Sequence, residues 1–304
     1  MKICSFLPSA TEIAFALGLG DSVVGVTHEC DFPPAAKSRR IVVKSAVDQD
    51  RCTSGEIDRV VAEHLRSGKS VYTIDLEQLR AADPDIILTQ ELCDVCAVDY
   101  REVEGAARLL GGKPRIISLA PGTLSDVIRD IETVGAATGR SAEAREFTRR
   151  LKEQIERVRE RAANSDLRPR AACIEWLDPL YSAGHWVPEM VEIAGGENGL
   201  GEKGRPSRRF DWEELVAFSP EVLVLMPCGF DVARTLQEIH LLERLPGWNQ
   251  LAAVANRRIF VVDGHAYFNR SGPRLVDGLE ILAQMIHPEM FPWVASEKAA
   301  RKVP

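Results

Sequence analysis

Two stretches of this sequence repeat one pattern. Residues 76–88 read LEQLRAADPDIIL, and residues 212–224, which begin 136 positions later, read WEELVAFSPEVLV. Each stretch has the apolar spacing of a short amphipathic helix, then a proline, then an apolar run of strand length. The repeat aligns Glu77 with Glu213. It predicts two similar α/β lobes, and the cleft between such lobes is where a small ligand binds.

Length and composition indicate the class of protein. The chain has 304 residues, of which 45% are hydrophobic, and this suits about two domains with their own cores. The net charge of −7 argues against a nucleic acid as the main partner. No apolar run approaches the roughly 20 residues of a membrane-spanning helix. The seven cysteines are dispersed and odd in number, which favours reduced thiols over a disulfide framework.

The first residues bear on the location of the protein. They read MKICSFLP and lead directly into a run typical of a strand. They lack the basic start, the apolar core of roughly 7–15 residues and the small-residue cleavage site of a secretory leader. As written, the sequence therefore predicts a cytoplasmic protein. A periplasmic or cell-surface location is the alternative if the N-terminus has been trimmed.

The repeats and the segment between them divide the chain into four parts. We expect an N-terminal α/β lobe at residues 1–138, a linker helix at 139–167, a C-terminal α/β lobe at 168–288 and a loose tail at 289–304. The linker carries one narrow apolar stripe, and at 1.5 Å per residue its roughly 24 helical residues would be about 36 Å long. The predicted fold class is α/β, with two Rossmann-like lobes joined by one long α-helix and a ligand cleft between them. The stripe consists of Ala144, Phe147, Leu151, Ile155, Val158 and Ala162.

The loops that follow the predicted strands supply the candidate ligand contacts, because ligands of open α/β sheets bind outside the carboxyl ends of the strands. Aromatic side chains there offer flat faces for a macrocycle, and polar neighbours can satisfy its periphery. A histidine could form a hydrogen bond with the ligand or coordinate its metal. The expected contacts are Pro8, Ser9, His28, Cys93, Cys96, His185, Trp186, Cys228, Phe230, Tyr267, Phe268 and Arg270.

The sharpest motif is the pair Cys93 and Cys96, which follows a predicted strand and precedes a predicted helix. A helix N-terminus can lower the pKa of a thiol, so a redox pair is one interpretation. Metal ligation is another, because His28 and Cys30 on a neighbouring loop would complete the four ligands that zinc prefers, with iron as the other candidate metal. The third interpretation is quiet thiols that brace the cleft, with Cys228 on the equivalent loop of the second lobe.

A basic cluster and the absence of catalytic motifs complete the residue-level analysis. Arg205, Arg208 and Arg209 either meet an anionic ligand or form solvated surface. The sequence contains no nucleophile elbow, phosphate-binding P-loop or HExxH motif. We therefore expect a binding protein that is not an enzyme, with no catalytic residues and no required cofactor.

Several motifs along residues 2–286 point to one family. They are Pro8–Glu12, Asp31–Pro34, Tyr181–Gly184, Gly195–Asn198 and Phe268–Arg274. Their order around a long helix resembles that of the vitamin B12 (cobalamin) and iron-siderophore periplasmic binding proteins, and it is most similar to the cobalamin-binding branch. The resemblance implies two α/β lobes joined by one helix, with the ligand between them.

The resemblance also implies a function and partners. The protein would bind a corrinoid as a monomer and serve as the substrate-binding component of an ABC importer. One acidic residue on each lobe, by position Glu77 and Glu213, would dock onto arginines of the permease. The alternative for both is a solvated carboxylate near a helix start, where negative charge is favourable. Two other functions stay open: a ferric-siderophore or haem binder that uses the arginine cluster, and a cytoplasmic metal- or redox-active protein that uses Cys93 and Cys96.

Residues 48–72 depart from the family's pattern, because they add a helical segment before the helix of Glu77. The apolar residues of this segment have the spacing of one buried stripe. Ser54 is a candidate cap at its start, because serine commonly precedes the first helical turn.

Overall fold

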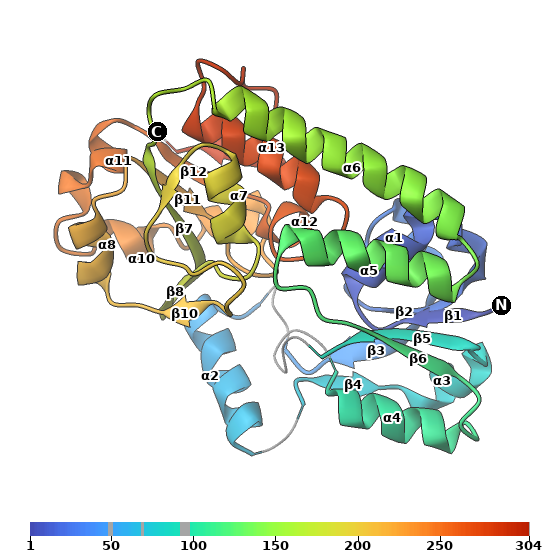
Figure 1. Cartoon of the computed structure of the whole chain (residues 1–304). Helices are drawn as coiled ribbons and strands as arrows, with labels where there is room; N and C mark the ends of the chain where they lie inside the picture. Colours follow the sequence, from blue (N-terminus) through green and yellow to red (C-terminus); the bar gives the residue numbers. More distant parts are fainter. Residues whose placement is uncertain (48–50, 68–69, 92–97, 304) are drawn as a thin grey trace. The chain divides into compact units, whose positions relative to one another are not determined.

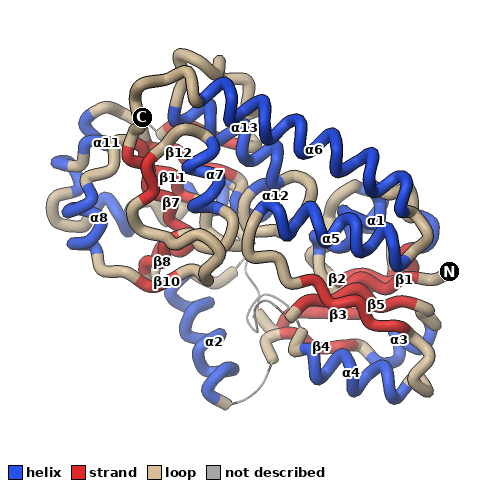
Figure 2. Tube along the Cα trace, viewed as in Figure 1, coloured by secondary structure: helices blue, strands red, loops and turns tan. Residues whose placement is uncertain are grey.

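The chain forms two compact units, each built on its own β-sheet (Figure 1, Figure 2). The structure is a computed structural model, and it describes all residues except 48–50, 68–69, 92–97 and 304. The predicted class, two α/β lobes, is confirmed. Unit 1 comprises residues 1–48, 59–121 and 125–150, and unit 2 comprises residues 49–58, 122–124 and 151–304.

Unit 1 is a mostly parallel sheet between helices. Its strands are β1 (Ile3–Ser5), β2 (Val23–Thr27), β3 (Arg40–Ser45), β4 (Tyr72–Ile74), β5 (Ile86–Gln90) and β6 (Arg115–Leu119). Its helices are α1 (Pro8–Ala16), α3 (Leu76–Ala82), α4 (Tyr100–Leu109) and α5 (Leu124–Ala137), with 3₁₀ turns at Gly20–Ser22 and Pro34–Ser38.

The sheet of unit 1 has the order β4-β3-β2-β1-β5-β6. Its neighbouring strands are parallel except β3 and β4. Helices α1 and α5 lie on one face, and α3 and α4 lie on the other (Figure 1). Because both faces are covered, the central strand β5 is apolar at its start and buried along its whole length.

Unit 2 repeats this plan with antiparallel additions at both edges. Its strands are β7 (Arg170–Leu177), β8 (Leu180–Ser182), β9 (Glu197–Asn198), β10 (Arg208–Arg209), β11 (Val222–Leu225), β12 (Ile259–Val262) and β13 (Ala300–Lys302). Its helices are α7 (Val187–Ile193), α8 (Trp212–Phe218), α9 (Val232–Leu236), α10 (His240–Glu243), α11 (Ala252–Ala255), α12 (Gly264–Tyr267) and α13 (Leu275–Ile286), with a 3₁₀ turn at Trp248–Gln250.

The sheet of unit 2 has the order β10-β8-β7-β11-β12-β13, and β9 pairs with β7. Strands β7, β11 and β12 are parallel, whereas β8, β10 and β13 join in antiparallel fashion. One face of these central strands packs against α8, α9, α10 and α11 through a continuous apolar core that includes Trp212, Leu215, Leu223 and Val261.

The repeat read from the sequence is a repeat of structure. Asp75 accepts a hydrogen bond from a backbone N–H at the start of α3, and Asp211 forms a capping box at the start of α8. Both helices end at a residue in the left-handed conformation, Asp83 with φ 48° and Ser219 with φ 49°. The strands that follow, β5 and β11, are each hydrogen-bonded on both sides within their sheets.

The predicted linker is α6 (Ser141–Ala162), which the two units share at residues 150 and 151. Its stripe is buried at Ala144, Leu151 and Val158, and the Arg150 guanidinium lies over the half-buried Phe147 ring. The charged residues of α6 lie on its other faces, as the 3- and 4-residue spacing predicts. None of the helices that the structure describes combines the length and the apolar character needed to span a bilayer.

The C-terminal residues are not a loose tail, so that expectation is wrong. Strand β13 pairs with β12, with Arg301 opposite Val261. Upstream of it, the Trp293 ring stacks on Phe260 with centroids 5.7 Å apart. A three-residue strand has almost no local signature, because its stability comes from a partner far away in the sequence.

Helix α2 (Ser54–Arg66) begins one residue earlier than its sequence signal suggests, because Ser54 was the predicted cap. Thr53 is the capping residue: its hydroxyl accepts from the Glu56 N–H, and its own N–H donates to the Glu56 carboxylate at 2.8 Å. This reciprocal pair is a capping box. Ser54 is instead the first helical residue and is fully buried.

Candidate ligand-binding site

Three predicted contacts lie at the carboxyl edge of the sheet in unit 1. Pro8 and Ser9 follow β1 and form the first turn of α1, where the fixed φ of proline suits a helix start. His28 follows β2, and its backbone N–H donates to the Val43 carbonyl at 3.1 Å. The His28 side chain is exposed and its Nε2 lies 3.9 Å from Glu29 Oε1, whereas Ser9 is buried.

Three of the described thiols are buried in the cores of the units. Cys30 is buried, and its Sγ lies 3.1 Å from Thr11 Oγ1 and 3.4 Å from Thr27 Oγ1. Cys4 and Cys173 are also buried, and desolvation raises the pKa of each to about 12. A thiol with so high a pKa is protonated at neutral pH and is a poor nucleophile.

The metal and redox interpretations gain no support from the described residues. Cys93 and Cys96 lie outside the part of the chain that the structure describes. Within that part, His, Cys, Asp and Glu side chains form no group of three that could hold a metal ion. Cys30 is held by two threonine hydroxyls, and His28 is solvent-exposed. A role for the pair Cys93 and Cys96 stays a prediction.

In unit 2, two of the expected aromatic contacts are buried. The Trp186 side chain precedes α7 and is 5% exposed, and its Nε1–H donates to the Phe268 carbonyl at 2.8 Å. The Phe268 ring is fully buried. Both rings were expected to offer a face to the ligand, and this expectation is wrong because they fill the core and hold the loop after α12 in place.

Phe230 is likewise buried, between two other side chains. The Arg234 guanidinium lies 4.2 Å from its ring centroid, and the Trp176 ring lies 5.3 Å away. The Phe230 ring is 1% exposed, so its expected role as a ligand contact must be corrected to support of Trp176. Cys228, on the same loop, is half-buried.

Trp176 is a candidate contact that the sequence analysis missed. It lies near the end of β7, at the carboxyl edge of the sheet, and is half-buried. Its Nε1–H donates to the Asp178 carbonyl at 3.0 Å, which fixes the ring orientation. The same strand-end rule that selected the other loops applies to Trp176, because it lies one residue before the end of β7.

His185 occupies a restrained loop position. Its φ of 52° is unusual for a residue other than glycine, and its backbone N–H and carbonyl bond to the Arg205 carbonyl and the Gly204 N–H. Burial lowers the pKa of its imidazole below the ordinary value. A neutral imidazole at pH 7 can accept a hydrogen bond or coordinate a metal ion.

The basic cluster is partly neutralised within unit 2. Arg208 forms an ion pair with Glu214 at 2.7 Å. The hydrogen bond that Arg208 donates is the main reason that the pKa of Glu214 lies below its ordinary value. Arg205 lies 3.8 Å from Glu202, and Arg209 is exposed. These contacts favour the interpretation of a solvated, internally paired surface.

The residues after α12 include a polar side chain, Asn269, that belongs to the aromatic-polar segment following β12 in the sequence. Both Asn269 amide atoms are buried and have no hydrogen-bond partner among the described residues. Nearby in sequence, the Arg270 guanidinium, 8% exposed, bonds to the His265 ring, and Arg274 lies over the half-buried Tyr267 ring at 5.7 Å. An amide can both donate and accept hydrogen bonds, and these two atoms would have to become exposed to contact a ligand.

The two proposed docking residues occupy equivalent places. Glu77 and Glu213 are exposed in the first turns of α3 and α8, one in each unit. Each follows an aspartate cap, Asp75 or Asp211, by two residues. The symmetry of the two positions is a consequence of the internal repeat.

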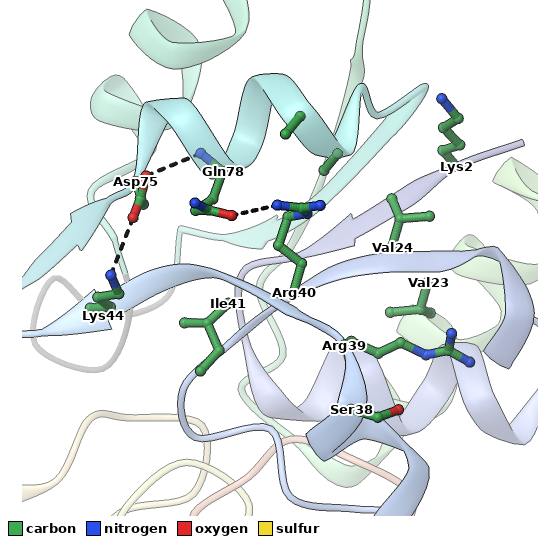
Figure 3. Close-up of a pocket in the computed structure, with 12 residues that line it drawn as sticks. Lys2, Val23, Val24, Ser38, Arg39, Arg40, Ile41, Lys44, Asp75 and Gln78 are labelled. Atoms are coloured by element: carbon green, nitrogen blue, oxygen red, sulfur yellow. Dashed lines mark hydrogen bonds and ion pairs between the residues drawn. The ribbon is translucent and has the colours of Figure 1, made fainter.

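A groove of about 940 Å³ in unit 1 flanks α3 (Figure 3). Lys2, Arg39 and Arg40 line it, and Figure 3 shows Arg40 directed toward Gln78, to which it donates a hydrogen bond. Lys44 bonds to the Asp75 carboxylate at 3.2 Å. Because its lining includes the starts of β1, β2 and β3, this groove is distinct from the carboxyl edge that the ligand rule selects.

The chain belongs to the periplasmic binding protein family, whose model matches residues 3–266. An uncharacterized ABC transporter substrate-binding lipoprotein of Bacillus subtilis is 27% identical over 95% of this chain and 81% of its own length. A vitamin B12-binding protein of Vibrio cholerae is 25% identical over 92% of this chain and 86% of its own length. The predicted family resemblance is therefore confirmed.

Solved structures share the fold. A periplasmic haem-binding protein of Pseudomonas aeruginosa aligns with a TM-score of 0.72 at 19% identity, over 100% of this chain and 99% of that chain. The periplasmic vitamin B12-binding protein of Vibrio cholerae aligns with a TM-score of 0.68 at 22% identity, over 94% and 96%. These proteins are similar in fold and bind different ligands, so the fold alone does not select a ligand.

Proposed function

We propose that this protein is the substrate-binding component of an ABC importer and that its ligand is a corrinoid. The observation that carries the proposal is the carboxyl edge of unit 2. There Trp176 offers a half-buried indole supported by Phe230, and Asn269 holds an amide without a partner among the described residues. A corrinoid has a broad ring for the indole and amide side chains for the asparagine.

Haem is the second candidate ligand, and His185 favours it. Burial lowers the pKa of this imidazole, so the ring is neutral at pH 7 and its nitrogen can coordinate iron. Tyr267, the last residue of α12, is a further oxygen ligand of suitable chemistry. A haem ligand would therefore depend on His185 or Tyr267, whereas a corrinoid would not require either.

Titration of the purified protein with cyanocobalamin and with hemin, followed by calorimetry and absorbance, tests both candidates. Trp176→Ala should weaken binding of the true ligand by about tenfold or more, because one well-packed aromatic contact is worth roughly 1–2 kcal/mol. Trp293→Ala is the matched control, since this exposed tryptophan stacks on Phe260 away from the carboxyl edge. Failure of both compounds to bind with a Kd below about 1 mM would reject this ligand class.

The acidic residues Glu77 and Glu213 support the transporter assignment. Exposed carboxylates at equivalent places in two repeated units suit a partner that engages both units at once. We propose that they contact basic residues of a permease. Their places in the first helical turns also suit the helix dipole, so their effect on stability alone should be small.

The location of the protein follows the same assignment. One curated relative is named as an ABC transporter substrate-binding lipoprotein, and the family is that of periplasmic binding proteins, which does not support a cytoplasmic location. We propose that the protein works outside the cytoplasmic membrane. Fractionation of the native host with an antibody against the chain tests this, and recovery only with cytoplasmic markers would contradict it.

A further inference from the structure

Residues 51–58, which we call the latch, belong to unit 2 although they lie between strands of unit 1 in the sequence. The Ser54 backbone N–H donates to both carboxylate oxygens of Glu238, at 3.0 and 3.2 Å. Ser54 and Glu238 are both buried. A buried carboxylate from unit 2 thus satisfies a backbone donor at the start of α2, which would otherwise be costly to bury.

Arg234 completes this attachment. Its Nη2 lies 2.6 Å from Glu238 Oε1 and donates to the Cys52 carbonyl at 2.8 Å. The guanidinium side chain is 16% exposed and stacks on Phe230. Because Arg234 and Glu238 are largely removed from water, loss of either charge would leave the other buried without its partner.

Asp178 also lies close to the latch. A Cβ added to Gly55 would lie 2.5 Å from Asp178 Oδ2, so a larger residue there would require that carboxylate to move. Burial raises the pKa of Asp58, while the charge of Arg209 on β10 lowers it and that of Asp178 raises it. Figure 1 shows α2 beginning beside β8 and β10.

The seat of the latch is continuous with the candidate ligand contact. Arg234 stacks on Phe230, and Phe230 packs against Trp176, so one chain of contacts runs from the latch to the half-buried indole. Asp178 follows β7, and Arg234 and Glu238 follow β11, which places the seat at the carboxyl edge of the sheet. A change in the latch would therefore alter the support of Trp176.

We propose that residues 51–58 form a separately opening latch, held on unit 2 by Glu238 and Arg234, whose closure strengthens ligand binding through Arg234, Phe230 and Trp176. This coupling rests on the proposed function, whereas the latch itself does not. Glu238 and Arg234 are positioning residues, since they act through the aromatic pair. By reciprocity, a ligand that binds more tightly to the closed form must also stabilise closure.

Hydrogen exchange measured by mass spectrometry on the full chain, without ligand, tests the latch. Glu238→Gln keeps the shape of the side chain and removes its charge, and it should speed exchange of the peptide that contains Ser54 about tenfold or more. Peptides from β7, β11 and β12 should keep their wild-type rates. Glu243→Gln, an exposed glutamate on α10, is the matched control and should change nothing.

Two outcomes would overturn the latch. One is an unchanged rate at Ser54 in Glu238→Gln, and the other is an equal acceleration across the sheet, which would show a general loss of stability. If Glu238→Gln does not fold, Arg234→Lys provides the same test. It keeps the positive charge but cannot reproduce the planar stack on Phe230 together with the bond to the Cys52 carbonyl.

Cyanocobalamin or hemin, whichever binds the wild type, then tests the coupling. The bound probe should slow exchange at Ser54. Glu238→Gln should raise the Kd of that probe by about tenfold. This increase in Kd should not exceed the factor by which the probe slows exchange in the wild type. An unchanged Kd in a variant whose latch exchanges faster would reject the coupling. If neither probe binds the wild type, the proposed ligand class fails, while the exchange experiment still decides the latch.

Discussion

Trp186 shows at the level of one residue how burial changes an interpretation. Its indole N–H bonds to the Phe268 carbonyl inside unit 2. Trp186→Phe keeps most of the ring and leaves that buried carbonyl without its partner, which should lower the free energy of unfolding by about 1–3 kcal/mol. Urea unfolding measures this change.

The ligand-binding constant of Trp186→Phe should stay within about twofold of the wild type, because the ring is buried in the core. A variant that unfolds like the wild type but binds ligand tenfold more weakly would contradict the structural role and restore the predicted contact. Trp293→Phe serves as the control for substitution of an exposed tryptophan.

Asp130 on α5 should make stability depend on pH. Burial, and then the nearby charge of Asp126, raise its pKa from 3.8 to about 7, although Arg129 opposes them. One carboxylate oxygen, Oδ2, is buried without a hydrogen-bond partner in the described chain. Between about pH 4 and pH 7, Asp130 is therefore protonated in the folded form and deprotonated in the unfolded form. The stabilising contribution is present below about pH 4 and is lost as the pH rises through about 7.

Asp130→Asn resembles the protonated acid and should remove this loss. At pH 8 the variant should be more stable than the wild type by about 1–2 kcal/mol, the scale of one unsatisfied buried group. At pH 4 the two proteins should be nearly equal. Urea unfolding at several pH values measures the difference, and a gap that does not change with pH would contradict the assignment.

Part of the residue-level site could be predicted from the sequence. The strand-end rule correctly placed Pro8, Ser9 and His28 on one edge of unit 1. It could not separate a partly exposed ring such as Trp176 from a buried ring such as Phe230, because exposure depends on which neighbours cover each ring. That difference depends on side chains brought together by folding.

At the scale of elements, the start of α8 allows a direct test of the repeated capping. Asp211 and Glu214 form a capping box at this helix. Asp211→Ala should lower the free energy of unfolding by about 1 kcal/mol, because a backbone N–H loses its acceptor. Asp211→Asn keeps an acceptor and should cost clearly less. Equal losses in thermal or urea unfolding for the two variants would show that the cap is not the cause.

Elements with strong local patterns were predictable, and those that depend on distant partners were not. The spacing in the sequence predicts α6 and its buried stripe, and the repeat predicts α3 with β5 and α8 with β11. Strand β13 was missed because it is held by pairing with β12, a strand from an earlier part of the chain. Its three residues are too few to show a periodic pattern.

At the scale of the whole molecule, the proposed docking residues should affect transport without affecting ligand binding. Replacement of both Glu77 and Glu213 by alanine should lower ligand uptake by the native host about tenfold or more, because each unit would lose its charged contact with the permease. The Kd of the purified double variant should match the wild type. Uptake of labelled ligand and calorimetry measure the two effects.

Glu243→Ala, on exposed surface of unit 2, is the control for this experiment and should leave uptake unchanged. Normal uptake by the double variant would show that Glu77 and Glu213 are solvated carboxylates at helix starts. The repeat made these two positions predictable, since the same helix occurs in both units. The assignment of residues 51–58 to unit 2 was not predictable, because it depends on hydrogen bonds to Arg234 and Glu238, far later in the chain.

The latch also constrains how the protein is made. Ser54 and its acceptor Glu238 are 184 residues apart. At roughly 5–20 residues per second, the ribosome produces Glu238 about ten to forty seconds after Ser54. Throughout that interval the nascent chain lacks the carboxylate that accepts the Ser54 N–H, so the latch segment stays accessible to chaperones and proteases until Glu238 has been made.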